Sequence, residues 1–332
     1  MHQSECTFED SKLYYQLRVV LVKYCCTKNS LNRLHFKLPL TKEVRPMSDY
    51  AKCNQSTIKF QSPLNRRSEV LEPLYQRFIP SSIRFRRNVK QAKLTDVVVL
   101  ALLCWQVELG MTDQRRFYRF LTSLGFQNLP ERSRFSRICA RTNRLFQLIR
   151  CGLMWTAMPQ PSYTIIDSFP MPLCQNICNR RAKLFKSKAD IGYNAIKKMW
   201  YYGFKGSFEV TNQGVAVAYT ITAASKHDIK MVPILVDQYL CQHILGDVGY
   251  LSQKLHQQLA KIGVDFWTPK RRNMKQPKAD QRLLKRQRRR IETVFSKWVS
   301  CFDLEHNRAR SLSGFQTRIE QCLFVDTWFR IN

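Results

Sequence analysis

Residues 200–222 read WYYGFKGSFEVTNQGVAVAYTIT, and this stretch decides the fold class. Its first half is rich in aromatic and β-branched side chains, which favour strands. Asn212-Gln213-Gly214 then supplies turn residues, and from Val215 to Thr222 larger apolar side chains alternate with alanine and threonine. The stretch therefore predicts two adjacent strands that form a hairpin.

Short strands and helices alternate on both sides of this hairpin. Upstream, residues 163–166 form an apolar run that ends at Asp167 and predicts a strand. Downstream, the apolar spacing predicts a helix, a strand, a helix, a strand and a long amphipathic helix, over residues 231–240, 244–245, 251–262, 264–267 and 280–300. This order predicts an α/β fold with a mixed sheet between helices.

The chain before residue 159 has a different sequence pattern, which is typical of helices. Between about residues 70 and 150, apolar side chains recur at helical spacing. The apolar run over residues 97–105 predicts a buried helix, and Thr95 is placed to cap it. Residues 1–60 show the weakest pattern, and we assign them no role.

The composition indicates a folded protein that meets a polyanion. Of the 332 residues, 55 are Lys or Arg and 24 are Asp or Glu, which leaves a formal net charge of +31, and 44% are hydrophobic. This apolar content suffices for one or two packed domains and excludes a disordered basic tail. Nucleic acid is the commonest partner of so large a positive surplus. An acidic membrane is the weaker alternative, because no transmembrane segment accompanies the basic residues.

The number and spacing of the cysteines indicate the redox state of the compartment in which the protein folds. Twelve Cys are spread along the chain, and no charged start with an apolar signal core precedes them. Such usage is typical of a reducing cytoplasm. Cys174 and Cys178 have no second pair at metal-binding spacing, so structural zinc is not favoured.

Acidic residues are scarce, so their positions are informative. Asp167 and Asp247 each follow a predicted strand, and ligands commonly bind beyond the carboxyl ends of strands. Glu292 lies on the long amphipathic helix, beside its apolar stripe. Each acid also has an ordinary interpretation, either as a turn residue or as the helical partner of Arg288 and Arg289.

Three carboxylates from two strand ends and one helix suit a pair of divalent ions. Two such ions about 3.5–4 Å apart activate an attacking oxygen and stabilise the leaving oxygen in an in-line displacement at a phosphodiester. Carboxylate oxygens are the ligands that Mg²⁺ prefers. The neighbouring pair His227-Asp228 suggests a general base, but it also fits a turn and helix cap, and we assign it at most a supporting role.

Five segments around these acids resemble the DDE transposases of bacterial insertion sequences, most closely the nine-eighty-two group. The segments are IIDSFPMPLC (165–174), YGFK (202–205), GDVGY (246–250), RIET (290–293) and LEHNRARS (304–311). The resemblance extends from near Arg87 to about Trp328. The order and context of these segments are far more specific than three acids alone.

The resemblance implies an RNase H-like mixed sheet flanked by helices and preceded by a helical N-terminal domain. Asp167, Asp247 and Glu292 would be the catalytic residues and would bind Mg²⁺, with Mn²⁺ as a substitute. The implied division is an unassigned extension (1–60), a helical DNA-binding domain (61–158) and an RNase H-like DDE catalytic domain (159–332).

The same resemblance implies an insertion-sequence transposase acting on double-stranded DNA. Such an enzyme binds the terminal inverted repeats of its element, cleaves phosphodiesters with Mg²⁺-activated water and joins the 3′-OH ends to target DNA. We expect a homodimer on DNA, in the cytoplasm at the nucleoid, and no membrane partner. Two alternatives stay open: an RNase H-like nuclease without strand transfer, and an inactive DNA-binding remnant.

Basic residues that would hold the DNA precede Glu292. Residues 270–290 contain eleven Lys or Arg and one acid, Asp280. A solvated helix face is the ordinary interpretation of such a run, but its position beside Glu292 favours phosphate contacts. Trp267 suits base stacking, although core packing is commoner for tryptophan. The expected DNA-binding residues are Trp267, Lys270, Arg271, Arg272, Lys285, Arg288, Arg289 and Lys297.

Overall fold

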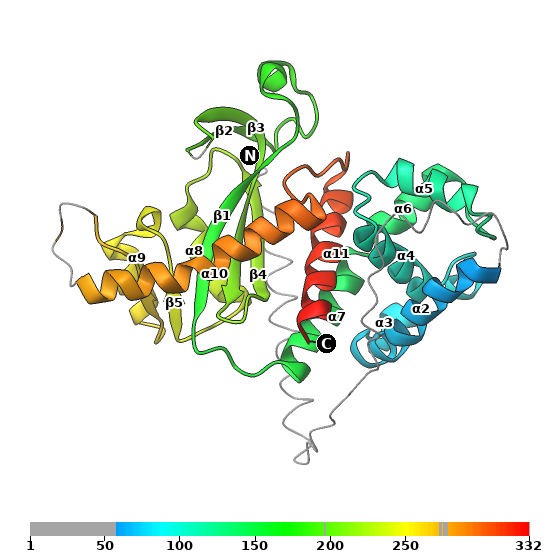
Figure 1. The fold of residues 1–332 in the computed structure, drawn as a ribbon, viewed down its shortest axis with the longest axis horizontal. Helices are drawn as coiled ribbons and strands as arrows, with labels where there is room; N and C mark the ends of the chain where they lie inside the picture. Colours follow the sequence, from blue (N-terminus) through cyan, green and yellow to red (C-terminus); the bar gives the residue numbers. More distant parts are fainter. Residues whose placement is uncertain (1–57, 196, 272–273, 275–277, 332) are drawn as a thin grey trace, which may run out of the picture.

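The computed structural model describes residues 58–331, apart from residues 196, 272–273 and 275–277. The extension expected over residues 1–60 therefore lies outside the described residues, except for its last three. In the described part, a helical region lies beside a mixed sheet that is flanked by helices (Figure 1). This arrangement confirms the predicted α/β class with a helical region before the sheet.

The helical region is centred on α4 (Asp96–Glu108), in which most side chains are buried. The predicted cap is confirmed, because the Thr95 hydroxyl accepts a hydrogen bond from the Val98 amide at 3.3 Å. No helix among the described residues combines the length and the apolar content needed to cross a membrane. The other elements of the region are α2 (Ile58–Phe78), α3 (Ser81–Arg84), η2 (Val89–Gln91), α5 (Gln114–Ser123), α6 (Arg132–Ala140) and α7 (Asn143–Ala157).

The sheet has the strand order β2-β3-β1-β5-β6, and β4 pairs with the same edge of β3 as β2 does. Strands β1 to β4 pair antiparallel, whereas β1, β5 and β6 are parallel to one another. The hairpin predicted from residues 200–222 is confirmed as β3 and β4. The strands are β1 (Thr164–Pro172), β2 (Asp190–Asn194), β3 (Met199–Thr211), β4 (Ala216–Ala223), β5 (His243–Leu245) and β6 (Asp265–Trp267).

Strand β1 is longer than the sequence predicts. The apolar run indicated a strand that stops before Asp167, whereas β1 continues through Asp167 to Pro172. All nine residues of β1 pair with the thirteen-residue β3, which supplies hydrogen-bonding partners beyond the apolar run. The prediction that Asp167 ends its strand is therefore wrong.

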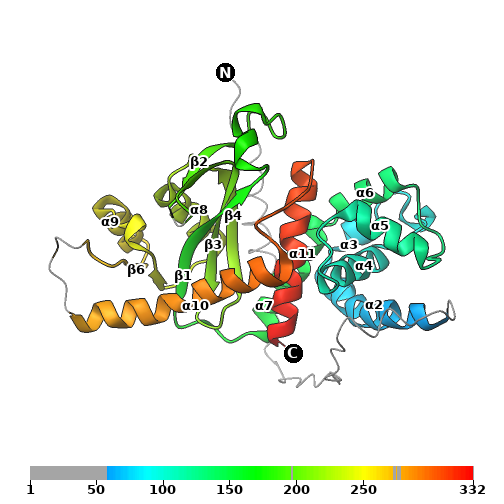
Figure 2. The ribbon, with the colours of Figure 1, turned by 45° about the horizontal axis from the view of Figure 1, so that its top comes forward.

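The two faces of the sheet carry different helices. On one face, α8 (Val232–Gln238) and α9 (Gln253–Ala260) pack around Ile166. On the other face, α10 (Lys278–Phe302) crosses β1 (Figure 2) and buries its predicted apolar stripe, including Trp298. Because side chains alternate along a strand, neighbouring residues of β1 face opposite helical layers.

The last helix, α11 (Leu312–Ile331), joins the helical region to the sheet. It packs against α7, α4 and α6, although the sequence-based division assigns it to residues 159–332. Arg150 of α7 donates to Glu320 of α11 at 2.9 Å and to the Ala216 carbonyl of β4 at 2.7 Å. Only 2% of each side chain in this ion pair is exposed. One guanidinium thus ties α7, α11 and the sheet together, and the division at residue 158 stays a prediction.

A second buried acid on α11 holds α10 in place. The Asp326 side chain, 2% exposed, accepts from the Lys297 ammonium at 2.6 Å and from the Trp298 indole N–H at 3.0 Å, both on α10. Arg330 donates to the same carboxylate at 3.0 Å. Since a buried carboxylate without partners is costly, these contacts fix α10 against α11.

Glu209 of β3 is a fully buried acid inside the sheet. Its Oε1 accepts a hydrogen bond from the Thr164 hydroxyl at 2.6 Å, and no described group bonds to Oε2. Burial raises the pKa of Glu209 to about 8, against the smaller lowering effect of the Thr164 bond. The folded chain therefore keeps this carboxyl mostly protonated at neutral pH.

Replacing Glu320 with glutamine removes the charge that compensates Arg150. The variant leaves a buried guanidinium without its counter-charge, and we expect the free energy of unfolding in denaturant titrations to fall by about 3–5 kcal/mol. Glu108→Gln is the control, because it breaks a more exposed ion pair. In that pair the Arg67 side chain is 24% exposed and the Glu108 side chain is 29% exposed. We expect a loss below about 1 kcal/mol there. Equal losses in the two variants would contradict a special role for the buried pair.

The pH dependence of stability tests the protonation of Glu209. Its pKa rises from 4.5 to about 8 on folding, so the folded chain binds more protons between these values. Stability should therefore fall as pH rises through this window, by at most about 1.4 kcal/mol per pH unit. Glu209→Gln lacks this contribution. In denaturant titrations, the free energy of unfolding of the variant should therefore increase relative to that of the wild type as pH rises. A difference that does not change with pH would refute the raised pKa.

Candidate active site

Asp167 and Asp247 meet because two parallel strands stop pairing at the same level. The β1–β5 ladder ends at the pair Ile165↔Leu245, and each aspartate lies two residues beyond its strand's member of that pair. Neighbouring strands are about 4.8 Å apart, so the two acids become neighbours. The structure thus brings together two of the three predicted acids, even though β1 itself continues.

One guanidinium, that of Arg288 on α10, lies among all three predicted acids. Its Nη1 is 2.8 Å from Asp247 Oδ1, and its Nη2 is 3.6 Å from Asp167 Oδ2. The same Nη2 is 4.0 Å from Glu292 Oε1, one helical turn further along α10. The Arg288 side chain is 16% exposed and that of Glu292 is 60% exposed. The three acids therefore surround one cation, with Glu292 on the solvent side.

The two aspartates have different surroundings. Burial, with smaller contributions from the charges of Asp247 and Asp228, raises the pKa of Asp167 to about 6. The Ser168 backbone amide, which donates to Asp167 Oδ1 at 2.8 Å, and the charge of Arg288 oppose this effect. Asp247 is more exposed and accepts a hydrogen bond from the next backbone amide at 2.6 Å. A cation held between the two acids therefore favours the ionised form of Asp167.

A second polar group lies behind Asp167, and the sequence does not reveal it. The Ser168 hydroxyl donates to Asp228 Oδ1 at 2.9 Å, and Lys205 Nζ is 3.1 Å from the same oxygen. Sequence reasoning considers Asp228 only with His227, as a weak base or a helix cap. The sequence pattern that could have indicated this group is the alternation of side chains along β1, which turns Ser168 to the face opposite that of Asp167.

The oxygen donors at this site suit a hard divalent cation. Asp167 and Asp247 both turn an oxygen toward the same positive group, so positive charge between them is favoured. Among the residues that the structure describes, no three His, Cys, Asp or Glu side chains are close enough together to hold a metal ion. Glu292 is the third acid in reach of the guanidinium, and Arg288 lies between it and the aspartates.

The described members of the expected DNA-binding set lie at the end of β6, just after it in sequence, and on α10. Trp267 ends β6 with 40% of its surface exposed, and Lys270 and Arg271 follow it in sequence. Lys285 and Arg289 are exposed on α10, on either side of Arg288 in the sequence. Arg272 lies outside the described residues.

Lys297 differs from the other expected DNA-binding residues. Its ammonium lies 2.6 Å from Asp326, whose side chain is 2% exposed, so the charge is directed into the protein. Sequence position on α10 cannot distinguish this arrangement from a DNA contact, because the buried acid comes from α11. The geometry favours a structural role for Lys297.

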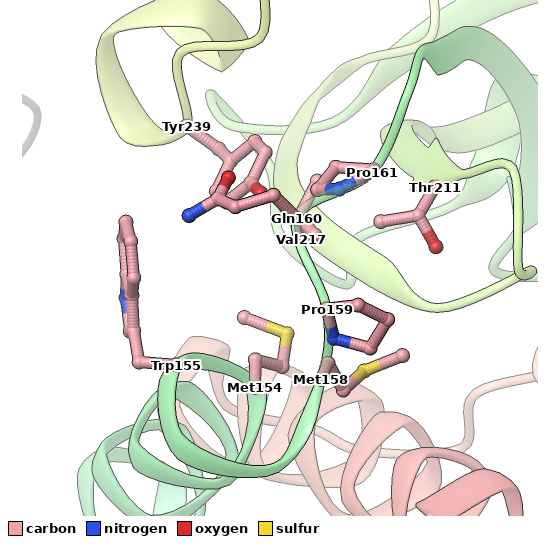
Figure 3. Close-up of a pocket in the computed structure, with 9 residues that line it drawn as sticks. All are labelled: Met154, Trp155, Met158, Pro159, Gln160, Pro161, Thr211, Val217 and Tyr239. Carbon is pink, nitrogen blue, oxygen red and sulfur yellow. The ribbon is translucent and has the colours of Figure 1, made fainter. Parts of the chain in front are cut away.

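A pocket at the end of α7 lies apart from the acids (Figure 3). The rings of Trp155 and Tyr239 border it, with centroids 6.0 Å apart. No predicted site residue lines this pocket, so it is not part of the candidate active site. Its lining residues are Met154, Trp155, Met158, Pro159, Gln160, Pro161, Thr211, Val217 and Tyr239.

Replacing Arg288 with alanine tests whether its guanidinium compensates the charge of the acids. Without metal, the two aspartates face each other, and we expect the unfolding temperature to fall by about 2–4 °C for each kcal/mol lost. Added Mg²⁺ or Mn²⁺ supplies the missing positive charge, so the ion should raise the midpoint of the variant more than that of the wild type. Arg289→Ala removes an exposed neighbouring cation and should respond as the wild type does. Equal metal-induced shifts in all three proteins would contradict this role.

Comparison with known proteins agrees with this site. Residues 160–312 match the family model described as transposase DDE domain, and this segment contains all three predicted acids and slightly less than half of the 332 residues. A search of curated proteins finds no match. The family match supports a DDE transposase, a class of enzyme that cleaves nucleic acid and whose substrate is DNA.

Proposed function

We propose that this protein is an insertion-sequence transposase of the nine-eighty-two group. Its RNase H-like catalytic domain spans residues 159–332 and follows a helical DNA-binding domain over residues 61–158. The observation that carries the proposal is the meeting of Asp167 and Asp247 around Arg288, with Glu292 one turn away, inside the segment that matches the DDE domain.

The proposed reaction has two stages. The enzyme hydrolyses a phosphodiester at each end of its element, and the exposed 3′-OH then attacks target DNA. Bound Mg²⁺, or Mn²⁺ in its place, supplies activation of the attacking oxygen and stabilisation of the leaving oxygen. Asp167, Asp247 and Glu292 hold the metal through carboxylate oxygens. The chain itself contributes positioning and charge compensation and forms no covalent intermediate.

Arg288 carries positive charge into the reaction centre. Its guanidinium keeps the two aspartates together in this proposal, which is supported by its distances of 2.8 Å to Asp247 and 3.6 Å to Asp167. On the same helical face as Glu292, it is placed to stabilise negative charge on the transferring phosphate. On the other side of β1, Asp228 pairs with Lys205 and accepts a hydrogen bond from Ser168, which supports the strand that carries Asp167.

The DNA lies along the basic path that leads to this centre. In this proposal Lys270, Arg271, Arg272, Lys285 and Arg289 contact phosphates, which positions the duplex without reading its sequence. Trp267 stacks on a base near the cleaved end. Lys297 is left out of this set because it pairs with Asp326. Two element ends must be held for joining, so we propose a homodimer on DNA.

A DNA-binding remnant without catalysis is the second candidate function. It is favoured by one observation, which is that no three acidic, His or Cys side chains converge as a metal site among the described residues. An RNase H-like nuclease without strand transfer shares the same acids, so geometry does not separate it from a transposase. Joining of a supplied 3′-OH end separates the two.

Activity on DNA that carries the gene with its own flanks tests the proposed function. We expect Mg²⁺-dependent cleavage at matched flanking repeats, followed by joining to a second DNA molecule. Asp167→Asn and Asp247→Asn should each lower the cleavage rate by about a hundredfold or more, because each removes a charged oxygen ligand, and should keep DNA affinity. Asp237→Asn, which changes an exposed acid on α8, should cleave as the wild type does.

Each contrary result points to a different protein. Cleavage without joining of a pre-cut 3′-OH end identifies a nuclease. DNA binding without metal-dependent cleavage in the wild type identifies a remnant. Full activity in Asp247→Asn would remove this residue from the metal site.

A further inference from the structure

A basic and aromatic surface lies at the far end of the sheet from the described DNA path. It is formed by the segment 173–189, which includes η3 (Asn176–Arg181), and by the tip of the β2–β3 hairpin. Figure 1 shows this segment projecting beyond β2 and the start of β3. We call it the hairpin surface. Its exposed cations are Arg180, Arg181, Lys183, Lys186, Lys188 and Lys198.

The two segments of the hairpin surface are fixed to each other. The Asn179 side chain donates to the Trp200 carbonyl at 2.9 Å and accepts from the Tyr202 amide at 3.1 Å. The Tyr202 hydroxyl donates to the Leu184 carbonyl at 2.9 Å. The Phe185 ring packs on the core with its centroid 5.4 Å from that of Phe204. The surface is therefore built in advance of any ligand.

The charge of the hairpin surface is almost all of one sign. Residues 173–200 contain seven Lys or Arg and one acid, Asp190. Asp190 accepts a hydrogen bond from Ser225 at 2.7 Å, and Lys197 pairs with Glu305 at 2.5 Å. Within the described part of the chain, the six cations of the surface have no acidic partner within ion-pair distance. Like charges gathered in this way are stabilised when a polyanion binds.

Two large aromatic rings stand exposed among these cations. Tyr193 is 52% exposed and Trp200 is 61% exposed, and their ring centroids are 5.2 Å apart at an angle of 56°. Leaving this much aromatic surface in water costs free energy that burial would recover. Aromatic faces accept any unpaired base, so rings beside cations are typical of nucleic-acid contacts.

The distance between the hairpin surface and the acids follows from the strand register. Strand β1 runs from Asp167 to Pro172, which pairs with Gly203, and β3 extends from there to the tip at Met199. At about 3.3 Å per residue, the tip is about 30 Å from Asp167 along the sheet. This length corresponds to about nine base pairs of duplex.

We propose that the hairpin surface binds DNA about nine base pairs from the reacting phosphodiester. Its cations contact the backbone, and the Tyr193–Trp200 pair stacks on an unpaired or unstacked base next to duplex. The inference rests on the proposed function, which makes DNA the polyanion. It adds a second contact region that the residues around α10 do not include.

DNA binding by the full chain, measured without divalent metal, tests this proposal. Fluorescence anisotropy across a salt series would use a labelled duplex and the same duplex with unpaired bases in one strand. The double variant Arg180→Ala, Arg181→Ala should lower the slope of log affinity against log salt by about two, because two phosphate contacts are lost. The double variant Arg180→Lys, Arg181→Lys should keep the slope.

The aromatic pair has a separate signature. Trp200→Ala should weaken binding to the DNA with unpaired bases by about tenfold and change binding to the full duplex less. Trp200→Phe keeps an aromatic face and should restore most of the affinity. Matched controls are Phe329→Ala, an aromatic residue 53% exposed on α11, and Lys254→Ala with Lys261→Ala, exposed cations at α9. Thermal unfolding of each variant verifies its fold.

The outcomes separate this proposal from the proposed function. An unchanged salt slope in the Arg180 and Arg181 alanine variant, with unchanged affinity in Trp200→Ala, overturns the hairpin surface even if the wild type cleaves DNA. A reduced slope and a selective loss in Trp200→Ala support the surface even if no metal-dependent cleavage occurs, and the proposed function then fails alone. Equal losses in the α9 control variant and the Arg180 and Arg181 variant also overturn it.

Discussion

The buried ion pair between Arg150 and Glu320 joins the helical region and the last helix to the sheet that carries the candidate site. Apolar side chains tolerate small sliding movements, whereas an unpaired charge in the interior costs several kcal/mol. The guanidinium also has fixed donor directions, and one of them is taken by the Ala216 carbonyl. A helix before the sheet, a strand within it and the last helix of the chain are thereby held at one point, although they are far apart in sequence.

Helix α11 connects this ion pair to α10, the helix that contacts the acids. Asp326 lies less than two turns beyond Glu320 on the same helix and receives Lys297 and Trp298 of α10. A straight helix then places Arg288 about 15 Å further along, over the point where β1 and β5 stop pairing. The position of Arg288 beside the aspartates thus depends in part on contacts that α10 makes with α11 near its other end. A buried network of this kind suits a site in which small displacements alter chemistry.

The distribution of charge links the site to its proposed substrate. Three acids lie around Arg288, whereas exposed cations lie just after β6, on α10 and on the hairpin surface. Cations spread over about 30 Å match the length of a bound duplex more closely than a single patch would. Arg288 places positive charge among these carboxylates, and it opposes the burial that, with the charge of Asp247, raises the pKa of Asp167.

Local sequence patterns determined the elements of this protein, and packing between distant elements decided the site. The β3–β4 hairpin, the Thr95 cap and the buried stripe of α10 were predictable, because alternation and helical periodicity record which face of an element is buried. The length of β1 was decided by its pairing with β3. The contact of Arg288 with an acid 41 residues away, and the turn of Lys297 toward Asp326, were decided by the placement of α10. Periodicity could not predict these contacts, because it shows that a face is buried but not which distant residues cover it.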